Sequence, residues 1–215
     1  GSTIRTWIND IPVTYLVDDM TAKGFIAFQV HAIYADMKPG MQVMWKNIRI
    51  QTGKDMQPRP LDKNVVVDNY LLNHVSPLEK EQGFRLLFNG KDLTGWVGNM
   101  TDYKVVDQTI LIDPTAGGKG NLYTQKEYDD FVFRFDFQLT PGANNGIGIR
   151  TPLEGDAAYV GMEIQVLDNT SPIYANLEAY QYHGSVYGII PAKREFLKPV
   201  GQWNEEEIRI EGDRI

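Results

Sequence analysis

The stretch Phe131 to Leu139, FVFRFDFQL, limits the fold more than any other part of this sequence. Aromatic or aliphatic residues occupy its odd positions, and the positions between them hold Val132, Arg134, Asp136 and Gln138. Successive side chains of a β-strand point to opposite faces of a sheet, so this period of two predicts a strand with one buried face. A helix would spread the same phenylalanines around its circumference and bury none of them well.

A second alternating stretch combines an apolar face with glycines. In residues 146–150, GIGIR, the side chains of Ile147 and Ile149 are predicted to face a core, while the glycines and Arg150 face away from it. Glycine weakens a strand, so its presence inside one usually marks a place where another group approaches the backbone closely.

A third alternating stretch carries polar groups that can do chemistry. In residues 161–167, GMEIQVL, the aliphatic side chains alternate with Gly161, Glu163 and Gln165, and Asp168 follows at the end of the strand. Together with the glycine-rich stretch, this pattern predicts a polar groove on a sheet whose other side is packed.

The rest of the chain indicates more strands and one short helix. Residues 3–50 contain four β-prone runs, and Asn9-Asp10 between the first two is a hairpin signal. Residues 54–75 are rich in proline and charge and are typical of a linker. Ser76, Pro77 and Glu79 then form a helix start with a capping box. We expect an all-β antiparallel sandwich with one short helix.

Composition excludes several classes of protein and of site. The formal net charge of the 215 residues is -7, which argues against a nucleic-acid or anionic-membrane partner because these require a basic face. No apolar run approaches the roughly 20 residues that span a bilayer. The absence of cysteine excludes disulfides and thiolate sites. Gly1 to Ile4 show no signal-peptide pattern.

Several motifs together resemble one known family. In order, they are LEKEQGFRLLFNGKDLTGW (78–96), NNGIGIRTP (144–152), YVGMEIQVLD (159–168), GSVYG (184–188) and KPVGQWNEEEIRIEGDRI (198–215). This series is similar to the 3-keto-disaccharide hydrolase family. Residues 3–50 resemble the C-terminal portion of the same family, so its parts occur in swapped order. The chain is therefore expected to span parts of two tandem copies or to be circularly permuted.

This resemblance implies a fold, an activity and a domain division. The fold would be a concanavalin A-like jelly-roll sandwich of two antiparallel sheets. The activity would be cleavage of 3-keto-glycosides by β-elimination and hydration, in the periplasm or outside the cell. No cofactor is expected: Glu163, Asp168 and His31 are residue types that could hold a metal ion, but no metal-binding spacing motif supports such a site. Residues 1–53 would supply C-terminal strands of one copy, 54–75 a linker, and 76–215 the first and central parts of a copy. A small carbohydrate would be the partner, with a neighbouring copy alongside.

Three residues are candidates for the chemistry. Arg150 would hold the keto or enolate oxygen with its permanently charged fork of donors, or else form a surface salt bridge. Glu163 would remove the proton at C2 or bind sugar hydroxyls, and His31 would move a proton or bind a hydroxyl. Glu163 could equally be a solvated side chain on a strand face, and His31 an ordinary surface residue.

Other residues are candidates for binding the sugar, by hydrogen bonds or by stacking of an aromatic ring on its C–H face. Asp168 could equally cap a turn, Trp203 could equally belong to the core, and Lys198 could simply be solvated. The candidates are Gln29, Gln165, Asn145, Asp168, Tyr187, Lys198, Trp203 and His183. A protein that binds sugar without cleaving it, or an adhesion repeat, remains an alternative because a fold does not dictate a function.

Overall fold

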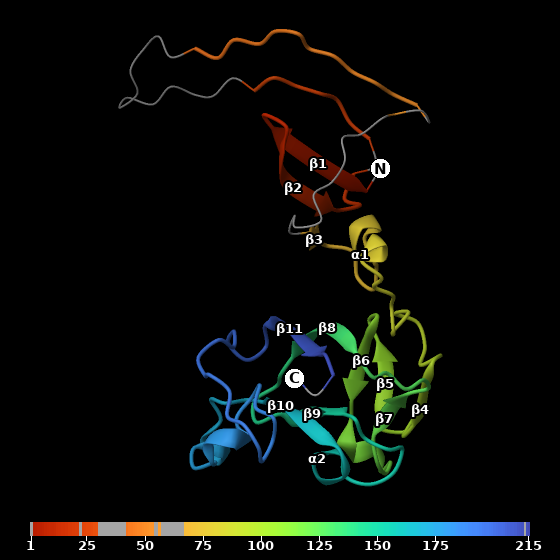
Figure 1. The fold of residues 1–215 in the computed structure, drawn as a ribbon, viewed down its shortest axis with the longest axis vertical. Helices are drawn as coiled ribbons and strands as arrows, with labels where there is room; N and C mark the ends of the chain where they lie inside the picture. Colours follow the sequence, from red (N-terminus) through yellow and green to blue (C-terminus); the bar gives the residue numbers. More distant parts are fainter. Residues whose placement is uncertain (1, 22, 30–41, 54–55, 57–66, 213) are drawn as a thin grey trace. The chain divides into compact units, whose positions relative to one another are not determined.

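The computed structural model describes residues 2–21, 23–29, 42–53, 56, 67–212 and 214–215 (Figure 1). His31 lies outside these residues. By their contacts, the residues divide into two compact units, Gly1–Leu86 and Leu87–Ile215. Each unit has its own small core.

The first unit is built on a hairpin. Strands β1 (Thr3–Ile8) and β2 (Ile11–Val17) pair antiparallel, and β3 (Val67–Asn69) adds to β2 in parallel. Asn9 and Asp10 connect the hairpin with φ angles of 50° and 69°. Two successive positive φ angles are the mark of a tight two-residue hairpin turn, so the predicted turn is confirmed.

Helix α1 (Pro77–Glu81) belongs to this first unit. The Ser76 hydroxyl accepts a hydrogen bond from the backbone N–H of Glu79, and the Glu79 carboxylate accepts one from the N–H of Ser76. The predicted capping box is therefore confirmed. Leu78 packs with Tyr15 and Val17 of β2. The structure thus groups α1 with the strands before it, whereas the sequence grouped it with those that follow.

Two β-prone runs of the first unit form no strands where they are described. Residues 23–29 and 42–53 are irregular and exposed, although the rings of Phe28 and Trp45 lie 4.9 Å apart. Phe25 and Met44 are almost wholly exposed. A strand needs a neighbour to satisfy its backbone, and these runs have no ladder partner among the described residues. The alternation of apolar and polar residues in these runs was therefore not sufficient to make them strands.

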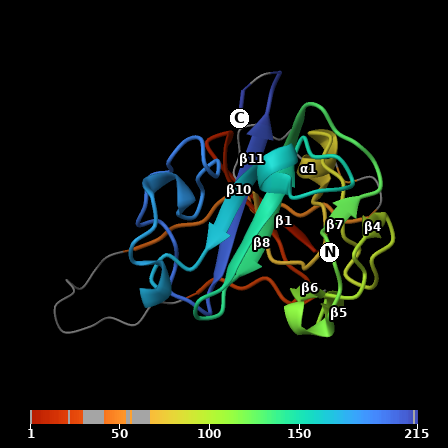
Figure 2. The same ribbon diagram turned by 90° about the horizontal axis from the view of Figure 1, so that it is seen from below.

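The second unit consists of antiparallel strand pairs (Figure 2). β8 (Phe131–Gln138) pairs with β11 (Trp203–Ile210), and β9 (Asn144–Ile149) pairs with β10 (Met162–Leu167). The smaller pairs are β4 (Trp96–Gly98) with β7 (Leu122–Thr124), and β5 (Tyr103–Val106) with β6 (Thr109–Ile112). Helix α2 (Ala157–Val160) and 3-10 turns at Pro114–Ala116, Pro172–Tyr174 and Ala179–Gln181 complete the unit.

The core of this unit lies between the two longest strand pairs. Ile149 and Ile164 of β9 and β10 pack with Ile208 and Ile210 of β11, and phenylalanines of β8 surround them. The inner side chains of β8 alternate with exposed ones along its whole length. The predicted all-β sandwich is confirmed. Across both units, the described residues form two short α-helices, α1 and α2, where the sequence indicated one.

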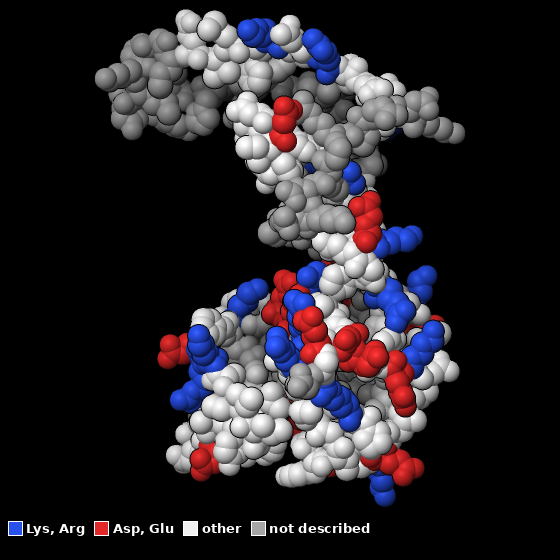
Figure 3. All heavy atoms as spheres, in the orientation of Figure 1, with Lys and Arg blue, Asp and Glu red and all other residues white. Residues whose placement is uncertain are grey.

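Charged side chains are mixed over the face of the second unit seen in Figure 3, with acidic and basic residues next to one another. Such mixing gives no single-sign field of the kind that steers polyanions. No helix in the described part of the chain has the length and apolar character needed to cross a bilayer.

Candidate functional site

Four polar side chains gather on the outer face of β10. In the register of the strands, Glu163 lies opposite Gly148, and Gln165 lies opposite Gly146. These side chains therefore point away from the core that Ile164 helps to form, as the alternation predicted. With Gln181 and Tyr187 from the following loop, they form what we call the Glu163 cluster.

Glu163 lies directly against the bare backbone of Gly146. A Cβ atom added at Gly146 would come within 1.8 Å of Oε1 of Glu163, far closer than two atoms can approach. Glycine at this position is therefore what lets the carboxyl group lie across the neighbouring strand. The predicted close approach to a strand glycine is made by a side chain of the protein itself.

The loop after β10 closes one side of the cluster. The backbone N–H of Tyr187 donates to the carbonyl of Glu163 at 2.8 Å. The amide of Gln181 donates to the hydroxyl oxygen of Tyr187 at 2.9 Å, and the amide of Gln165 donates to the carbonyl of Gln181 at 3.3 Å. Gln165 is buried, and its Oε1 has no partner among the described residues. An unpaired buried acceptor is costly, so it marks a place for a donor.

Burial changes the acidity of the Glu163 carboxyl group. Desolvation raises its pKa above the ordinary value, and the negative charge of Asp156 raises it further. A carboxyl group with a raised pKa is a stronger base once it is ionised. This chemistry suits removal of a proton from carbon next to a carbonyl group.

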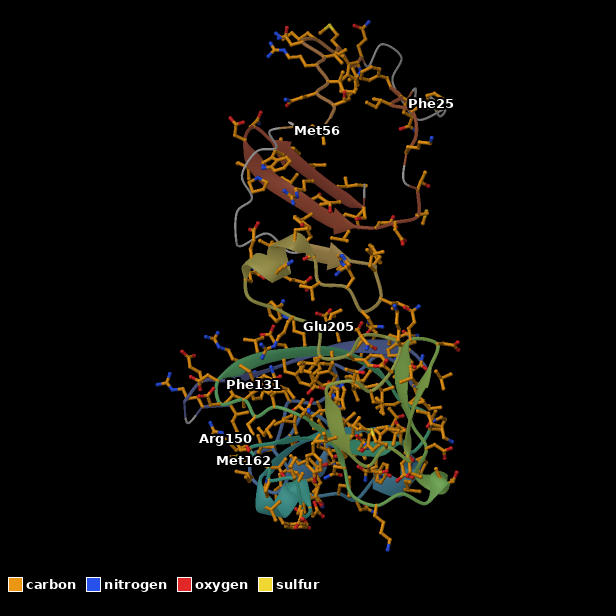
Figure 4. All side chains as sticks on the ribbon, turned by 90° about the vertical axis from the view of Figure 1, so that its right-hand side faces the viewer. Phe25, Met56, Phe131, Arg150, Met162 and Glu205 are labelled. Carbon is orange, nitrogen blue, oxygen red and sulfur yellow. The ribbon has the colours of Figure 1, made fainter. Side chains whose placement is uncertain are left out.

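Arg150 does not share this face. β9 ends at Ile149, and Arg150 follows it in the left-handed region with a φ of 53°, so the strand alternation stops one residue short of it. Its exposed guanidinium group donates to the carbonyl of Gly212. Figure 4 shows Arg150 close to Met162, the first residue of β10. The prediction that Arg150 points to the same side as Gly146 and Gly148 is wrong.

Two other candidates hold the structure together. Asp168 is buried, and its carboxylate accepts hydrogen bonds from the backbone of Gly142 at 2.8 Å and from both donors of Thr170. These bonds, the one from Gly142 first, lower its pKa. The turn-capping alternative therefore describes Asp168. Asn145 pairs with Val166 on the core side of the sheet, away from Glu163.

The remaining candidates lie apart from the cluster. Trp203 is 48% exposed on the outer side of β11, so it is not a core residue. Lys198 is exposed, and its backbone N–H donates to the side chain of Asn204 at 2.9 Å. Gln29 is exposed in the first unit. Of the predicted site residues, the structure therefore brings together Glu163, Gln165 and Tyr187.

A second polar pair, His183 and Glu206, lies at the other sheet. Glu206 shares a side of β11 with Ile208 and Ile210, so an acid occupies a position that the alternation reserves for the core. Its Oε2 lies 3.6 Å from Nε2 of His183, which is too long for a hydrogen bond. Sequence reasoning missed Glu206. The sequence feature that could have revealed it is a glutamate in WNEEEIRI at the same alternating positions as the two isoleucines.

Burial favours the neutral form of both members of this pair. It raises the pKa of Glu206 to about 7 and lowers the pKa of His183 to about 4. The backbone N–H of Leu167 donates to Nδ1 of His183 at 3.3 Å, so this nitrogen carries no proton. The contact is therefore not an ion pair, because an imidazolium would direct a second N–H at the N–H of Leu167.

The two shifts predict opposite effects of pH on stability. The neutral Glu206 contributes stability that is complete below pH 4.5 and is lost as the pH rises through about 7. The neutral His183 contributes stability that is complete above pH 6.5 and is lost as the pH falls through about 4. In the wild type these slopes largely cancel. Each variant keeps only the pH dependence of the residue that remains. Compared with the wild type, Glu206→Gln should therefore lose stability as the pH falls, and His183→Gln should lose stability as the pH rises.

Melting temperatures measured from pH 4 to 8 for the wild type and both variants test this expectation. Parallel curves for all three proteins would contradict the assignment of neutral His183 and neutral Glu206. Glu205→Gln, on the exposed side of the same strand, is the matched control and should follow the wild type.

One known protein family matches the part of the chain that forms the second unit. The family described as "3-keto-alpha-glucoside-1,2-lyase-like domain" matches residues 83–215 of this chain. The chain belongs to this family. All four residues of the Glu163 cluster, as well as His183 and Glu206, lie inside the matched range, whereas Gln29 and His31 lie outside it.

Individual relatives of this 3-keto-alpha-glucoside-1,2-lyase-like domain agree with the match. A curated protein of Bacteroides thetaiotaomicron named 3-keto-disaccharide hydrolase is 27% identical over 152 residues, which cover 60% of this chain and 52% of that protein. The chain thus spans about half the length of this relative. A crystal structure from Parabacteroides distasonis, titled as a candidate glycosyl hydrolase, is 26% identical with a TM-score of 0.53, over 64% of this chain and 68% of that one.

Proposed function

We propose that the Glu163 cluster belongs to a site that cleaves 3-keto-glycosides by β-elimination and hydration, which together give net hydrolysis of the glycoside. A ketone at C3 acidifies the proton on C2. When a base takes this proton, the electrons of the C2–H bond form the C1–C2 double bond, and the bond from C1 to the leaving group breaks. The leaving group takes up a proton. Water then adds its hydroxyl to C1 and its hydrogen to C2.

Glu163 is the base in this proposal, and its position is the observation that carries it. The carboxyl group is half-buried, is held against Gly146, and has a raised pKa. The family match and the curated relative named as a 3-keto-disaccharide hydrolase support a substrate of this class.

Tyr187 is the group that we assign to the oxygen at C3. Its hydroxyl oxygen accepts from the amide of Gln181, so its own proton is free to be donated to an enolate oxygen. Gln165, with its unpaired Oε1, would accept a hydrogen bond from a sugar hydroxyl. Arg150 is a weaker candidate for binding the enolate oxygen, because it follows the end of β9 and its guanidinium group donates to the carbonyl of Gly212, away from the Glu163 cluster.

A sugar-binding function without turnover is the second candidate. It is favoured by the uncharged character of Gln165, Gln181 and Tyr187, which suit hydroxyl recognition, and by the position of Arg150 off the cluster. Under this reading, Glu163 would bind hydroxyl groups and would transfer no proton. Both functions take a small carbohydrate as partner.

The decisive experiment offers the purified chain a 3-keto-glucoside with a chromogenic leaving group. Release of the leaving group, with a transient ultraviolet absorbance from the enone, is the expected result. Tyr187→Phe should slow this release, because the donor to the enolate is removed. Binding of the unoxidised glucoside with no release from the keto form would favour the second candidate.

Gly146→Ala gives an independent test of the geometry. The added methyl group would lie within 2.5 Å of Cγ, Cδ and Oε1 of Glu163, so the whole side chain must rotate and its carboxyl group must leave this position. We expect the rate of leaving-group release to fall by at least an order of magnitude, and a retained cooperative melting transition shows that the variant is folded. Gly24→Ala is the control, because nothing lies within 4 Å of a Cβ atom at Gly24. An unchanged rate would show that the carboxyl position does not matter.

A further inference from the structure

A hollow with a volume of ≈ 120 Å³ opens beside the His183–Glu206 pair. A single water molecule needs only about 10–15 Å³ of such space, so the hollow is large enough for a small organic ring. Its apolar lining comes from Phe137, Phe196 and Leu197. No residue of the Glu163 cluster lines it. The hollow is therefore distinct from the proposed catalytic site.

Two hydrogen-bond donors of the hollow are held in fixed orientations. Nδ1 of His183 accepts from Leu167, so the proton of the neutral ring is on Nε2, on the side of Glu206. The ring is held in place by Phe137, whose centroid is 5.1 Å away. Asn169 is oriented because its Oδ1 accepts from the backbone N–H of His183 at 3.0 Å, which leaves its amino group as a second donor.

The acceptor is the carboxyl group of Glu206. Its Oε2 is buried and has no hydrogen-bond partner among the described residues. Rotation about the last torsion of a glutamate side chain costs little, so either oxygen can turn to a ligand. A hydroxyl group satisfies both sides at once, because it accepts from Nε2–H of His183 and donates to Glu206.

The charges around the hollow favour a neutral ligand. Lys193 and Arg194 line it together with Glu195, Glu205 and Glu206, so neither sign dominates. The guanidinium group of Arg194 lies 4.3 Å from the centre of the Tyr182 ring and is engaged there. A bound cation would face the N–H of His183, and a bound anion would face the carboxyl group of Glu206.

We propose that the hollow between His183 and Glu206 is a second binding site, for an uncharged ring that carries hydroxyl groups, such as a hexopyranose. The apolar lining would contact its C–H face, while His183, Asn169 and Glu206 hold adjacent hydroxyl groups. This site would hold a sugar outside the catalytic cluster, and it does not depend on the catalytic proposal.

Titration of the full chain with methyl α-D-glucopyranoside, followed through the imidazole nitrogen signals of His183 by nuclear magnetic resonance, tests the proposal. In the free protein we expect the tautomer with the proton on Nε2, and added sugar should shift that signal. His183 is assigned by its loss in His183→Gln. The titration is done in the Glu163→Gln variant, so that turnover does not enter, and the nitrogen signals of His183 report on the hollow itself.

Two variants and three probes make the outcome decisive. Glu206→Leu should weaken the sugar at least 10-fold, and the milder Glu206→Gln, which keeps the shape of the side chain, should weaken it less. Tetrahydropyran, which has the ring but no hydroxyl groups, should not bind, and neither should acetate nor methylammonium. No shift with sugar, equal binding of tetrahydropyran, stronger binding of a charged probe, or unchanged affinity in Glu206→Leu would each overturn the proposal.

Discussion

Glu163→Gln should lower the rate of leaving-group release from a 3-keto-glucoside by about 10²–10⁴-fold, the usual contribution of a general base. Glutamine keeps the size and the hydrogen-bonding reach of the side chain but cannot take a proton. The Michaelis constant should change much less than the turnover number, since the amide still occupies the place beside Gly146. Steady-state kinetics of the two proteins provide the measurement.

Glu205→Gln is the matched control for this substitution. Glu205 lies on the exposed side of β11 and should tolerate the same change without loss of rate. If Glu163→Gln retained turnover within a factor of three of the wild type, Glu163 would not be the base. If the wild type showed no turnover and Glu163→Gln lost the ability to bind sugar, the second candidate function, sugar binding, would be supported instead.

The pH dependence of the same reaction adds a test of the environment. Since the base must be ionised, the rate should rise as the pH increases through the pKa of Glu163, which lies above that of an ordinary glutamate. Asp156 raises this pKa, so Asp156→Asn should move the rise to lower pH. Asparagine keeps an oxygen that can accept from the backbone N–H of Ala158, so α2 keeps its cap. An unmoved profile would show that Asp156 does not act on the base.

Ile208→Ala should destabilise the second unit by about 2–5 kcal/mol, the usual cost of cutting a buried isoleucine to alanine. Ile208 is 5% exposed in the core that joins β11 to β9 and β10, and it lies opposite Phe133 of β8. The truncation leaves a cavity between the two sheets, and well-packed neighbours close such a cavity only in part. Chemical denaturation followed by tryptophan fluorescence measures the change.

Val132→Ala is the matched control for the core substitution. Val132 lies on β8, one position away from Phe133, but on the outer face with 38% exposure. It should cost less than 1 kcal/mol, since exposed positions contribute little burial. Equal losses for Ile208→Ala and Val132→Ala would contradict the assignment of an inner and an outer face to this sheet.

Local chemistry was sufficient to predict the elements whose partners are close in the sequence. The capping box at Ser76 and Glu79 and the turn at Asn9-Asp10 join groups within three residues of each other, so their hydrogen bonds and φ angles follow from residue type. The face of Glu163 also followed from local chemistry, because strand alternation fixes which side each residue takes once its neighbours are known to be buried.

Alternation failed where a strand ended or never formed. Arg150 was placed by counting from Gly146, but the strand stops at Ile149 and the next residue takes a positive φ, which turns the side chain elsewhere. Residues 23–29 alternate as well as any true strand, yet they are irregular and exposed. A strand exists only when another backbone satisfies its donors and acceptors, and the sequence of one segment does not contain that partner.

By itself, the sequence determined that this is an all-β chain and that Glu163 and Gln165 share the side of their strand opposite the core. Tertiary structure alone decided that Gln181 and Tyr187 join them, that Asp168 caps a turn, and that His183 meets Glu206. Residues in a strand have faces set by a local period of two. Contacts between a loop and a distant strand depend on how sheets pack, and no short-range pattern encodes that packing.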